Sequence, residues 1–297
     1  MTLEIYTNNY KQLNAEDYLS LEDPDRKVIQ TGNIIQEYDK FRSRYEGKDT
    51  LSLFDKLITP FLEEEVELDT SRIKLSAVER DTDCGNKAAE VVNFAYNSRY
   101  VRNGGEVVDM ATDNLDFDGN SKIIIAKQQV GGEGVVLATF RVVYGSELDV
   151  FKLFEAEFPN EWPHRAEVTQ ENFPISFPGE LGRFSLHPIF DIIGSPENPL
   201  LREDSRTFKK LLLKKMWPEG MSLLRENGVT HPYFILAPHV KEFVASAGII
   251  PKDVEGIVPT ESDYALGIRS KFKEYWKPES NIWEQPEVYI APWEVTE

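Results

Sequence analysis

A ten-residue stretch, GELGRFSLHP at positions 179–188, restricts the fold of this chain more than any other part of it. It reads as a short strand, entered through a Pro-Gly pair and ended by a proline. Within it, Glu180 and Arg183 stand three residues apart and would face opposite sides of a regular strand. They share a face only if an extra residue bulges the strand, and Gly182 is the residue that would allow it.

A bulge at this place has a chemical consequence. It re-aims side chains and leaves a backbone N–H without a partner in the ladder. Acyl transfer needs a fixed donor of this kind to hold the oxyanion of its tetrahedral intermediate. The alternative is a plain strand with two charges at its solvated end, and the spacing alone leaves both interpretations open.

Composition limits the class of protein. The 297 residues are enough for one full core, and no apolar run approaches the roughly 18 residues of a membrane span. The first residues lack the pattern of a signal peptide, and a lone cysteine, Cys84, excludes an internal disulfide. We therefore expect a cytoplasmic protein. The net charge of −18 argues against general affinity for nucleic acid or anionic membrane, although a local basic patch is compatible with it.

The N-terminal part looks like an addition to the main domain. Residues 28–45 and 51–68 carry apolar residues at helical spacing, and Pro60 interrupts the second run. We expect two amphipathic helices that pack on a neighbour or a partner. Nothing in this part proposes chemistry.

From residue 73 the pattern becomes that of a mixed α/β layer. The long segment over 145–178 is rich in Phe, Glu and Pro, and we interpret it as a lid or cleft wall. The other expected elements are, in order, a strand over 73–78, a helix over 85–100, a hairpin of 122–128 with 135–144, the strand at 179–188, a loop over 190–198, a helix over 204–227, a strand over 233–237, a helix over 240–247, a strand over 254–258 and an extended surface tail after 275.

One arginine stands out in the hairpin. On the strand over 135–144, Arg141 shares a face with Leu137 and Thr139. That face points toward core or cleft, where an arginine is costly unless it is paired. Glu180 is the obvious candidate partner.

The order of these motifs resembles that of the acyl-homoserine-lactone (autoinducer) synthases, the long-chain N-acyl amino acid synthases and the exosortase-associated acyltransferases of the GNAT superfamily. The resemblance covers roughly two thirds of the chain, from Ala77 to about Trp276. The motifs that carry it are FAYNSRYVR at 94–102, DNLDFD at 113–118, ATFRV at 138–142, ELGRF at 180–184 and APHVKEFVASAGI at 237–249.

This resemblance implies a three-layer α/β/α fold of GNAT type, with a mixed sheet and a V-shaped cleft between two splayed strands. It places an acyltransferase domain at 71–277, after a helical extension at 1–70 and before an extended tail at 278–297. The cleft would hold an acyl-pantetheine arm on one side and a small amine acceptor on the other.

The resemblance also assigns residues. Glu180, Arg183 and Arg141 match the charged, catalytic cluster of the autoinducer synthases. Asp116 and Asp118 match their acidic pair, with Asp113 as an alternative member. The remaining implied substrate-binding residues are Arg99, Phe140, Phe184, Ser185 and Leu186. The tryptophan that usually follows the helix arginine has no counterpart here, so an amino acid or another amine is as good an acceptor as homoserine lactone.

The implied chemistry needs few groups. The acceptor amine must lose a proton and attack a thioester carbonyl. Glu180 is the candidate base, directly or through a water, and a backbone N–H near Phe184 or Ser185 is the candidate oxyanion donor. The two arginines would keep Glu180 ionised and bind an acceptor carboxylate. The alternatives are an ion cluster without a catalytic role, and His187 as the base.

The expected donor is acyl carrier protein rather than acyl-CoA. The loop after the strand, PIFDIIGSP at 188–196, lacks the glycine turn with which GNAT enzymes bind the CoA pyrophosphate. Carrier proteins are acidic, and a basic run offers a docking site; a solvated helix face is the alternative. Its members are Arg202, Arg206, Lys209, Lys210, Lys214 and Lys215, of which we assign docking to Arg206, Lys209, Lys210 and Lys214.

Other sites are not supported by their motifs. Residues 114–119 resemble half of a calcium loop, but Ile125 occupies the position that needs a bidentate Glu. We expect no bound metal and no bound cofactor beyond the acyl-phosphopantetheine of the donor. The competing class is a catalytically inactive GNAT-like domain that binds an acyl chain or a protein partner.

Overall fold

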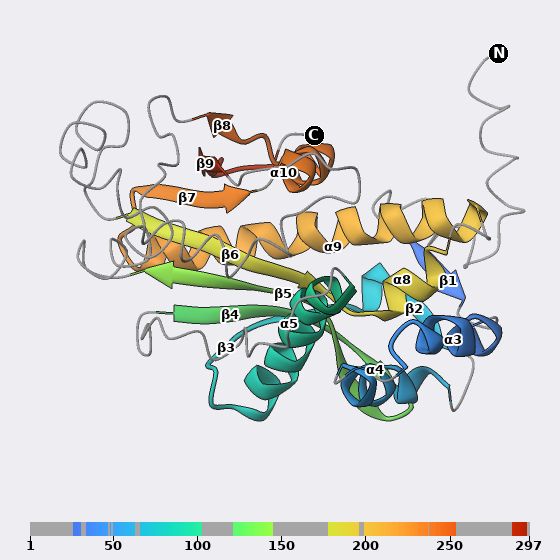
Figure 1. Ribbon diagram of the computed structural model, residues 1–297. Coiled ribbons are helices and arrows are strands. Elements are labelled where there is room, and N and C mark those ends of the chain that lie inside the picture. Colours follow the sequence, from blue (N-terminus) through green and yellow to red (C-terminus); the bar gives the residue numbers. More distant parts are fainter. Residues whose placement is uncertain are drawn as a thin grey trace, which may run out of the picture.

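The computed structural model describes residues 26–30, 34–46, 48, 50–62, 66–102, 121–144, 178–195, 199–236, 238–253 and 287–295. Their elements form a mixed α/β architecture (Figure 1). In chain order they are β1 (Val28–Gln30), α3 (Ile34–Ser43), α4 (Leu51–Ile58), η2 (Thr59–Phe61), β2 (Glu67–Asp69), η3 (Thr70–Arg72), β3 (Lys74–Val78), α5 (Asp83–Arg102), β4 (Ser121–Val130), β5 (Glu133–Tyr144), β6 (Pro178–Leu186), α8 (Ile189–Ile193), α9 (Pro199–Glu226), β7 (His231–Leu236), α10 (Pro238–Ser246), β8 (Lys252–Asp253) and β9 (Glu287–Ile290).

The main sheet has seven strands in the order β3-β4-β5-β6-β7-β9-β8. The expected hairpin forms β4 and β5, and the turn between them uses Gly131 and Gly132, both at positive φ. Every neighbouring pair is antiparallel except β6 and β7. A parallel pair needs a long crossover, and α9 is the long helix of that connection.

Helices cover both faces of this sheet (Figure 1). The long α9 packs closely on one face: a Cβ built on Gly220 would lie 2.7 Å from the Phe140 ring, and one on Gly179 would lie 2.6 Å from Leu224. Phe140 of β5 and Gly179 of β6 therefore face α9. Because side chains alternate along a strand, Arg141 and Glu180 face the opposite side, which α5 covers.

The N-terminal residues join the same hydrophobic core as the sheet. Tyr45 connects the two parts, because its ring contacts Phe54 of α4 at 5.0 Å and Phe94 of α5 at 5.4 Å. Two expectations were wrong here. Residues 28–30 and 67–69 are strands, β1 and β2, which pair with each other rather than extending the helices. Pairing satisfies the backbone groups of two segments too short to form stable helices.

Three further expectations were corrected. Residues 189–193, expected within a loop, form the short helix α8, because its four apolar side chains are buried. The long helix begins at Pro199, five residues early, since proline is well suited to a first helical turn. The end of the expected surface tail forms β9, an interior strand with Tyr289 only 1% exposed. The strand expected over 254–258 and the lid over 145–177 lie outside the described residues.

The parallel pair of β6 and β7 is short. Its register runs only from Pro178 opposite His231 to Leu181 opposite Phe234. Beyond this point the two strands no longer pair with each other, although β6 stays paired with β5 as far as Leu186 and β7 with β9 as far as Leu236. β6 and β7 thus separate toward their carboxyl ends (Figure 1), directly after the paired residues Leu181 and Phe234 that follow Glu180 and Tyr233.

Candidate active site

A bulge in β6 is the central feature of the candidate site. Arg141 of β5 lies opposite Gly182, whereas Thr139 lies opposite Ser185, so two residues of β6, Arg183 and Phe184, oppose Phe140 alone. Arg183 has a φ of 58°, the one positive value of a non-glycine residue in the described part of the chain. The expected bulge exists, but it begins after Gly182, and the strained residue is the arginine itself.

The bulge places residues five apart on one face. Glu180 and Ser185 would alternate to opposite sides of a regular strand, but both now share the side of Arg141 and Thr139. The hydroxyl oxygen of Thr139 is buried and has no hydrogen-bond partner among the described residues. A buried polar atom without a partner is uncommon in proteins and marks a place where a ligand or water completes the structure.

Glu180 is the buried acid of the site, with 4% of its surface exposed. One carboxylate oxygen lies 3.7 Å from the guanidinium Nη2 of Arg141, and the other accepts a hydrogen bond of 3.4 Å from the hydroxyl of Tyr233. The expected pairing of Glu180 with Arg141 is therefore present. Because Tyr233 belongs to β7, this hydrogen bond joins the carboxylate on β6 to the neighbouring strand of the parallel pair.

Burial raises the pKa of Glu180 above its ordinary value. The charge of Arg141 and the hydroxyl of Tyr233 lower this pKa, but they offset only part of the effect of desolvation. The expectation that arginines hold Glu180 firmly ionised thus needs revision. A carboxylate with a raised pKa is a stronger base than an exposed one, which suits proton abstraction.

Arg183 extends toward α5 rather than into bulk solvent. It is half-buried, and its guanidinium carbon lies 5.3 Å from the centre of the Tyr96 ring. This cation–π contact holds the charge on the same side of the sheet as Glu180. The three charges expected to form a cluster therefore share one face.

His187 is a structural residue in this geometry. It is buried against the Phe61 ring at 5.2 Å, and its Nδ1 accepts a hydrogen bond of 3.1 Å from the backbone N–H of Ile189. Burial lowers its pKa to about 3, although the backbone of Leu57 counteracts part of this effect. A base with so low a pKa is a poor proton acceptor at neutral pH.

The apolar residues assigned to substrate binding lie on the other face. Phe140 packs against Gly220 of α9 and is 3% exposed, so it belongs to the core. Phe184 is half-buried and stacks on Phe243 of α10 at 6.1 Å. Leu186, also half-buried, lies opposite Ala138. Phe184 and Leu186 thus lie on the length of β6 that no longer pairs with β7, where the two strands separate.

Three assigned residues cannot be placed. Asp116 and Asp118, with their alternative Asp113, lie outside the described residues. Arg99 falls within α5, two turns beyond Val92, but its side chain is not among those described.

The basic run expected to dock a carrier protein lies on α9 and is divided between its faces. Arg206, Lys210 and Lys214 follow one another at four-residue spacing and form one stripe. Lys215 points elsewhere and donates a hydrogen bond of 3.1 Å to the Thr70 carbonyl. Lys209 also leaves the stripe, because it lines a pocket beside α8.

The sequence did not identify two residues of the site. Tyr233 lies in a strand of apolar residues, and only the parallel pairing with β6 brings its hydroxyl to Glu180. Thr139 shows a weak signal, since it alternates in phase with Arg141.

The described residues show neither the features of a metal site nor those of a membrane-spanning helix. No group of three or more His, Cys, Asp or Glu side chains in the described ranges is arranged to hold a metal ion. Within those ranges, none of the helices combines the length and the apolar character needed to cross a bilayer.

Comparisons with known proteins add little to this geometry. The sequence matches no protein-family model and no curated protein. Among solved structures, the fold is similar to that of FeeM, an N-acyl amino acid synthase from uncultured soil microbes, with a TM-score of 0.40 and 10% identity. The match covers 74% of this chain and 89% of that chain. Similarity this weak carries no argument about function.

Proposed function

We propose that this protein is an N-acyltransferase of GNAT type, which moves a fatty acyl group from a pantetheine thioester to the amine of a small acceptor. The observation that carries the proposal is a buried carboxylate at the point where two parallel strands separate. Glu180 lies at this point, with Arg141 and Tyr233 beside it and the bulge immediately downstream.

Glu180 is the general base of the proposed reaction. Its carboxylate takes a proton from the acceptor ammonium, directly or through one water, and the free amine attacks the thioester carbonyl. The C–N bond forms, the carbonyl oxygen becomes an oxyanion, and collapse of this intermediate breaks the C–S bond. The pantetheine thiolate leaves and takes up the second proton of the attacking nitrogen, so the products are a neutral amide and a thiol.

The bulge is the proposed source of oxyanion stabilisation. A backbone N–H at Phe184 or Ser185 would donate to the developing charge, as fixed backbone donors do in other acyl-transfer sites. The unpaired hydroxyl of Thr139, opposite Ser185, offers a second donor. Arg183, held by Tyr96 on the same side, would bind the carboxylate of an amino acid acceptor.

The donor is proposed to be a cytoplasmic acyl carrier protein. The stripe of Arg206, Lys210 and Lys214 on α9 supports this choice, since carrier proteins are acidic. The lengths of β6 and β7 that do not pair with each other would accept the pantetheine arm between them, with Phe184 and Leu186 against the acyl chain.

Mass spectrometry of lipid extracts from cells that overproduce the protein tests the proposal. An N-acylated product would identify acyl chain and acceptor together. The product should disappear with Glu180→Gln and persist with Glu219→Gln, which changes an exposed carboxylate on α9. Equal amounts of product from the Glu180 variant and the wild type would remove Glu180 from the mechanism. The same extracts without any new N-acyl species would contradict the proposed activity.

The burial of Glu180 favours a second candidate, an inactive domain of the same fold that binds an acyl chain or a protein. In that case Glu180, Arg141 and Tyr233 form a structural cluster closed to substrate. Acyl-chain binding without turnover, unchanged in the Glu180→Gln variant, would support this candidate instead.

A further inference from the structure

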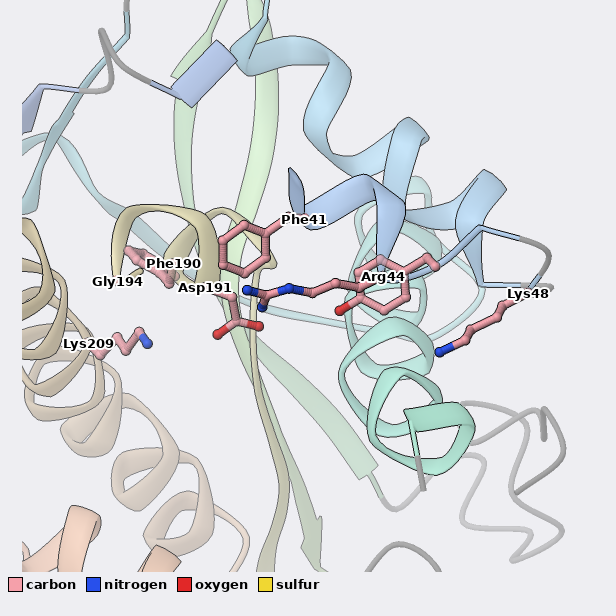
Figure 2. Close-up of a pocket in the computed structure, with 8 residues that line it drawn as sticks. Phe41, Arg44, Lys48, Phe190, Asp191, Gly194 and Lys209 are labelled. Atoms are coloured by element: carbon pink, nitrogen blue, oxygen red, sulfur yellow. The ribbon is translucent and has the colours of Figure 1, made fainter. Parts of the chain in front are cut away.

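A pocket of about 410 Å³ lies apart from the candidate active site. It is formed by α3 with the turn after it, by α8 and by α9 (Figure 2). Elements distant in sequence thus meet here, since Arg44 and Lys48 precede Lys209 by more than half of the chain. Pockets of about 300–1,000 Å³ are typical of small-molecule sites.

The charges of this pocket are unbalanced. Arg44, Lys48 and Lys209 line it, and Asp191 is the one carboxylate among the described residues that line it. None of these four side chains makes an ion pair with a residue that the structure describes. Figure 2 shows the Arg44 guanidinium and the Asp191 carboxylate turned toward the same space. Two positive charges therefore remain in excess.

Aromatic rings hold two of these cations in place. The guanidinium carbon of Arg44 lies 3.9 Å from the centre of the Phe41 ring, and the Lys209 ammonium lies 6.0 Å from that of Phe190. These rings are covered by the cations, so they position charge rather than stack a flat ligand. Lys209 is also partly desolvated, and burial lowers its pKa, which the charge of Asp191 only partly counteracts. The positive charge is thus maintained at a cost in stability, which an anion would remove.

We propose that this pocket binds the phosphate group of a small molecule. A phosphate monoester carries about 1.5–2 negative charges near neutral pH, which matches the excess of two. Arginine presents a planar fork suited to two phosphate oxygens, and lysine acts as a mobile point charge. A single carboxylate would leave one of the cations uncompensated.

The phosphate has two chemical sources. It belongs either to a separate phosphorylated metabolite, whose monoester supplies both charges, or to the pantetheine arm of the acyl donor, where a phosphodiester supplies one of them. The second source rests on the proposed function, whereas binding of phosphate does not. α8, which lines the pocket, begins at Ile189, just after β6 ends at Leu186. The pocket therefore lies near the end of the strand that carries Glu180.

Calorimetric titration of the full chain with inorganic phosphate tests the site. Arg44→Gln and Lys48→Gln should each weaken binding at least tenfold, and neither disturbs the core, because Arg44 is exposed and Lys48 is half-buried. Lys210→Gln is the matched control, since it removes one charge beside Lys209 without touching the pocket lining. Lys209→Met, with its fold checked by circular dichroism, should also lose binding.

Several results would overturn the proposal. They are absence of inorganic phosphate binding, equal affinity in the Arg44 variant and the wild type, or equal weakening by the Lys210 control, which would indicate attraction to general surface charge. A parallel titration with holo acyl carrier protein, which carries the arm as a phosphodiester, separates the sources. Carrier binding that the Arg44 and Lys48 variants abolish assigns the pocket to the donor arm, and binding of inorganic phosphate alone assigns it to a separate metabolite. Either result keeps the phosphate site, even if the N-acyl product is never found.

Discussion

Replacing Glu180 by glutamine should make the protein more stable at neutral pH. The substitution keeps the shape of the side chain and one of its two oxygens, which can accept a hydrogen bond from Tyr233 or face Arg141, and it removes the charge. At 3.7 Å, the attraction to Arg141 is worth about 4.5 kcal/mol at an effective dielectric constant of 20. The desolvation of a buried carboxylate costs several kcal/mol, and the raised pKa of Glu180 indicates that this cost is the larger.

The sign of the pH dependence follows from linkage. A carboxyl whose pKa is higher in the folded than in the unfolded protein binds more protons when folded, so its contribution to stability is full in acid and is lost as the pH rises. Each unit of difference corresponds to about 1.4 kcal/mol. The glutamine variant lacks this loss. Its advantage should therefore be absent below the ordinary Glu pKa of about 4.3 and grow by about 1.4 kcal/mol per pH unit until the pH passes the raised pKa of the folded protein.

Urea unfolding followed by tryptophan fluorescence from pH 4 to pH 8 measures this advantage. His187 contributes in the opposite sense, because a pKa lowered to about 3 by burial makes stability fall in acid. That contribution is common to both proteins and cancels in their difference. Glu219→Gln, an exposed change, should give a flat difference near zero. A glutamine variant that is less stable at pH 7, by an amount independent of pH, would refute the reasoning.

Three further predictions concern the site and its surroundings. Gly182→Ala should keep the fold and lower activity at least tenfold, because its Cβ would lie 2.7 Å from a Glu180 carboxylate oxygen. The control is Gly134→Ala, whose Cβ would have no atom closer than 3.7 Å. Equal activity of the Gly182 variant and the wild type would contradict the assigned position of the carboxylate. Charge reversal at Lys210 and Lys214 should raise the Michaelis constant for acyl carrier protein, less so at high salt; an unchanged constant would discard docking on α9. Lys209→Met should raise the melting temperature without phosphate, and a fall would show that the ammonium is stabilised by partners.

Local sequence signals predicted the centre of the site well. Pro178 and Gly179 at the start of β6 indicated a strand. Two charges three residues apart, which share a face only on an irregular strand, favoured a bulge as one of two interpretations. The strand and the bulge are both present. The alternation around Arg141 gave the correct face and the correct partner. These features depend on neighbours along the chain, where periodicity is a direct physical signal.

The signals failed where distant contacts decide. Gly182 was the residue predicted to allow the bulge, yet Arg183 takes the positive φ, and its guanidinium lies against the ring of Tyr96, 87 residues earlier in the chain. Residues 28–30 have helical spacing but pair with 67–69, and β9 enters the sheet from the far end of the chain. Tyr233 gave no polar signal at all, since its role depends on pairing between β6 and β7.

The position of the strand separation follows from how β6 is anchored. Gly179 lies so close to Leu224 of α9 and to Val229, just after the helix, that the first residues of β6 are held against them, and their pairing with β7 is kept. The bulge at Arg183 then turns the strand, so that the residues after it no longer match the register of β7. Glu180 lies between the anchor and the bulge. It is therefore fixed by pairing with β5 and with β7, and the length of β6 that no longer pairs with β7 begins two residues later, which is where a rigid base and an entering substrate can meet.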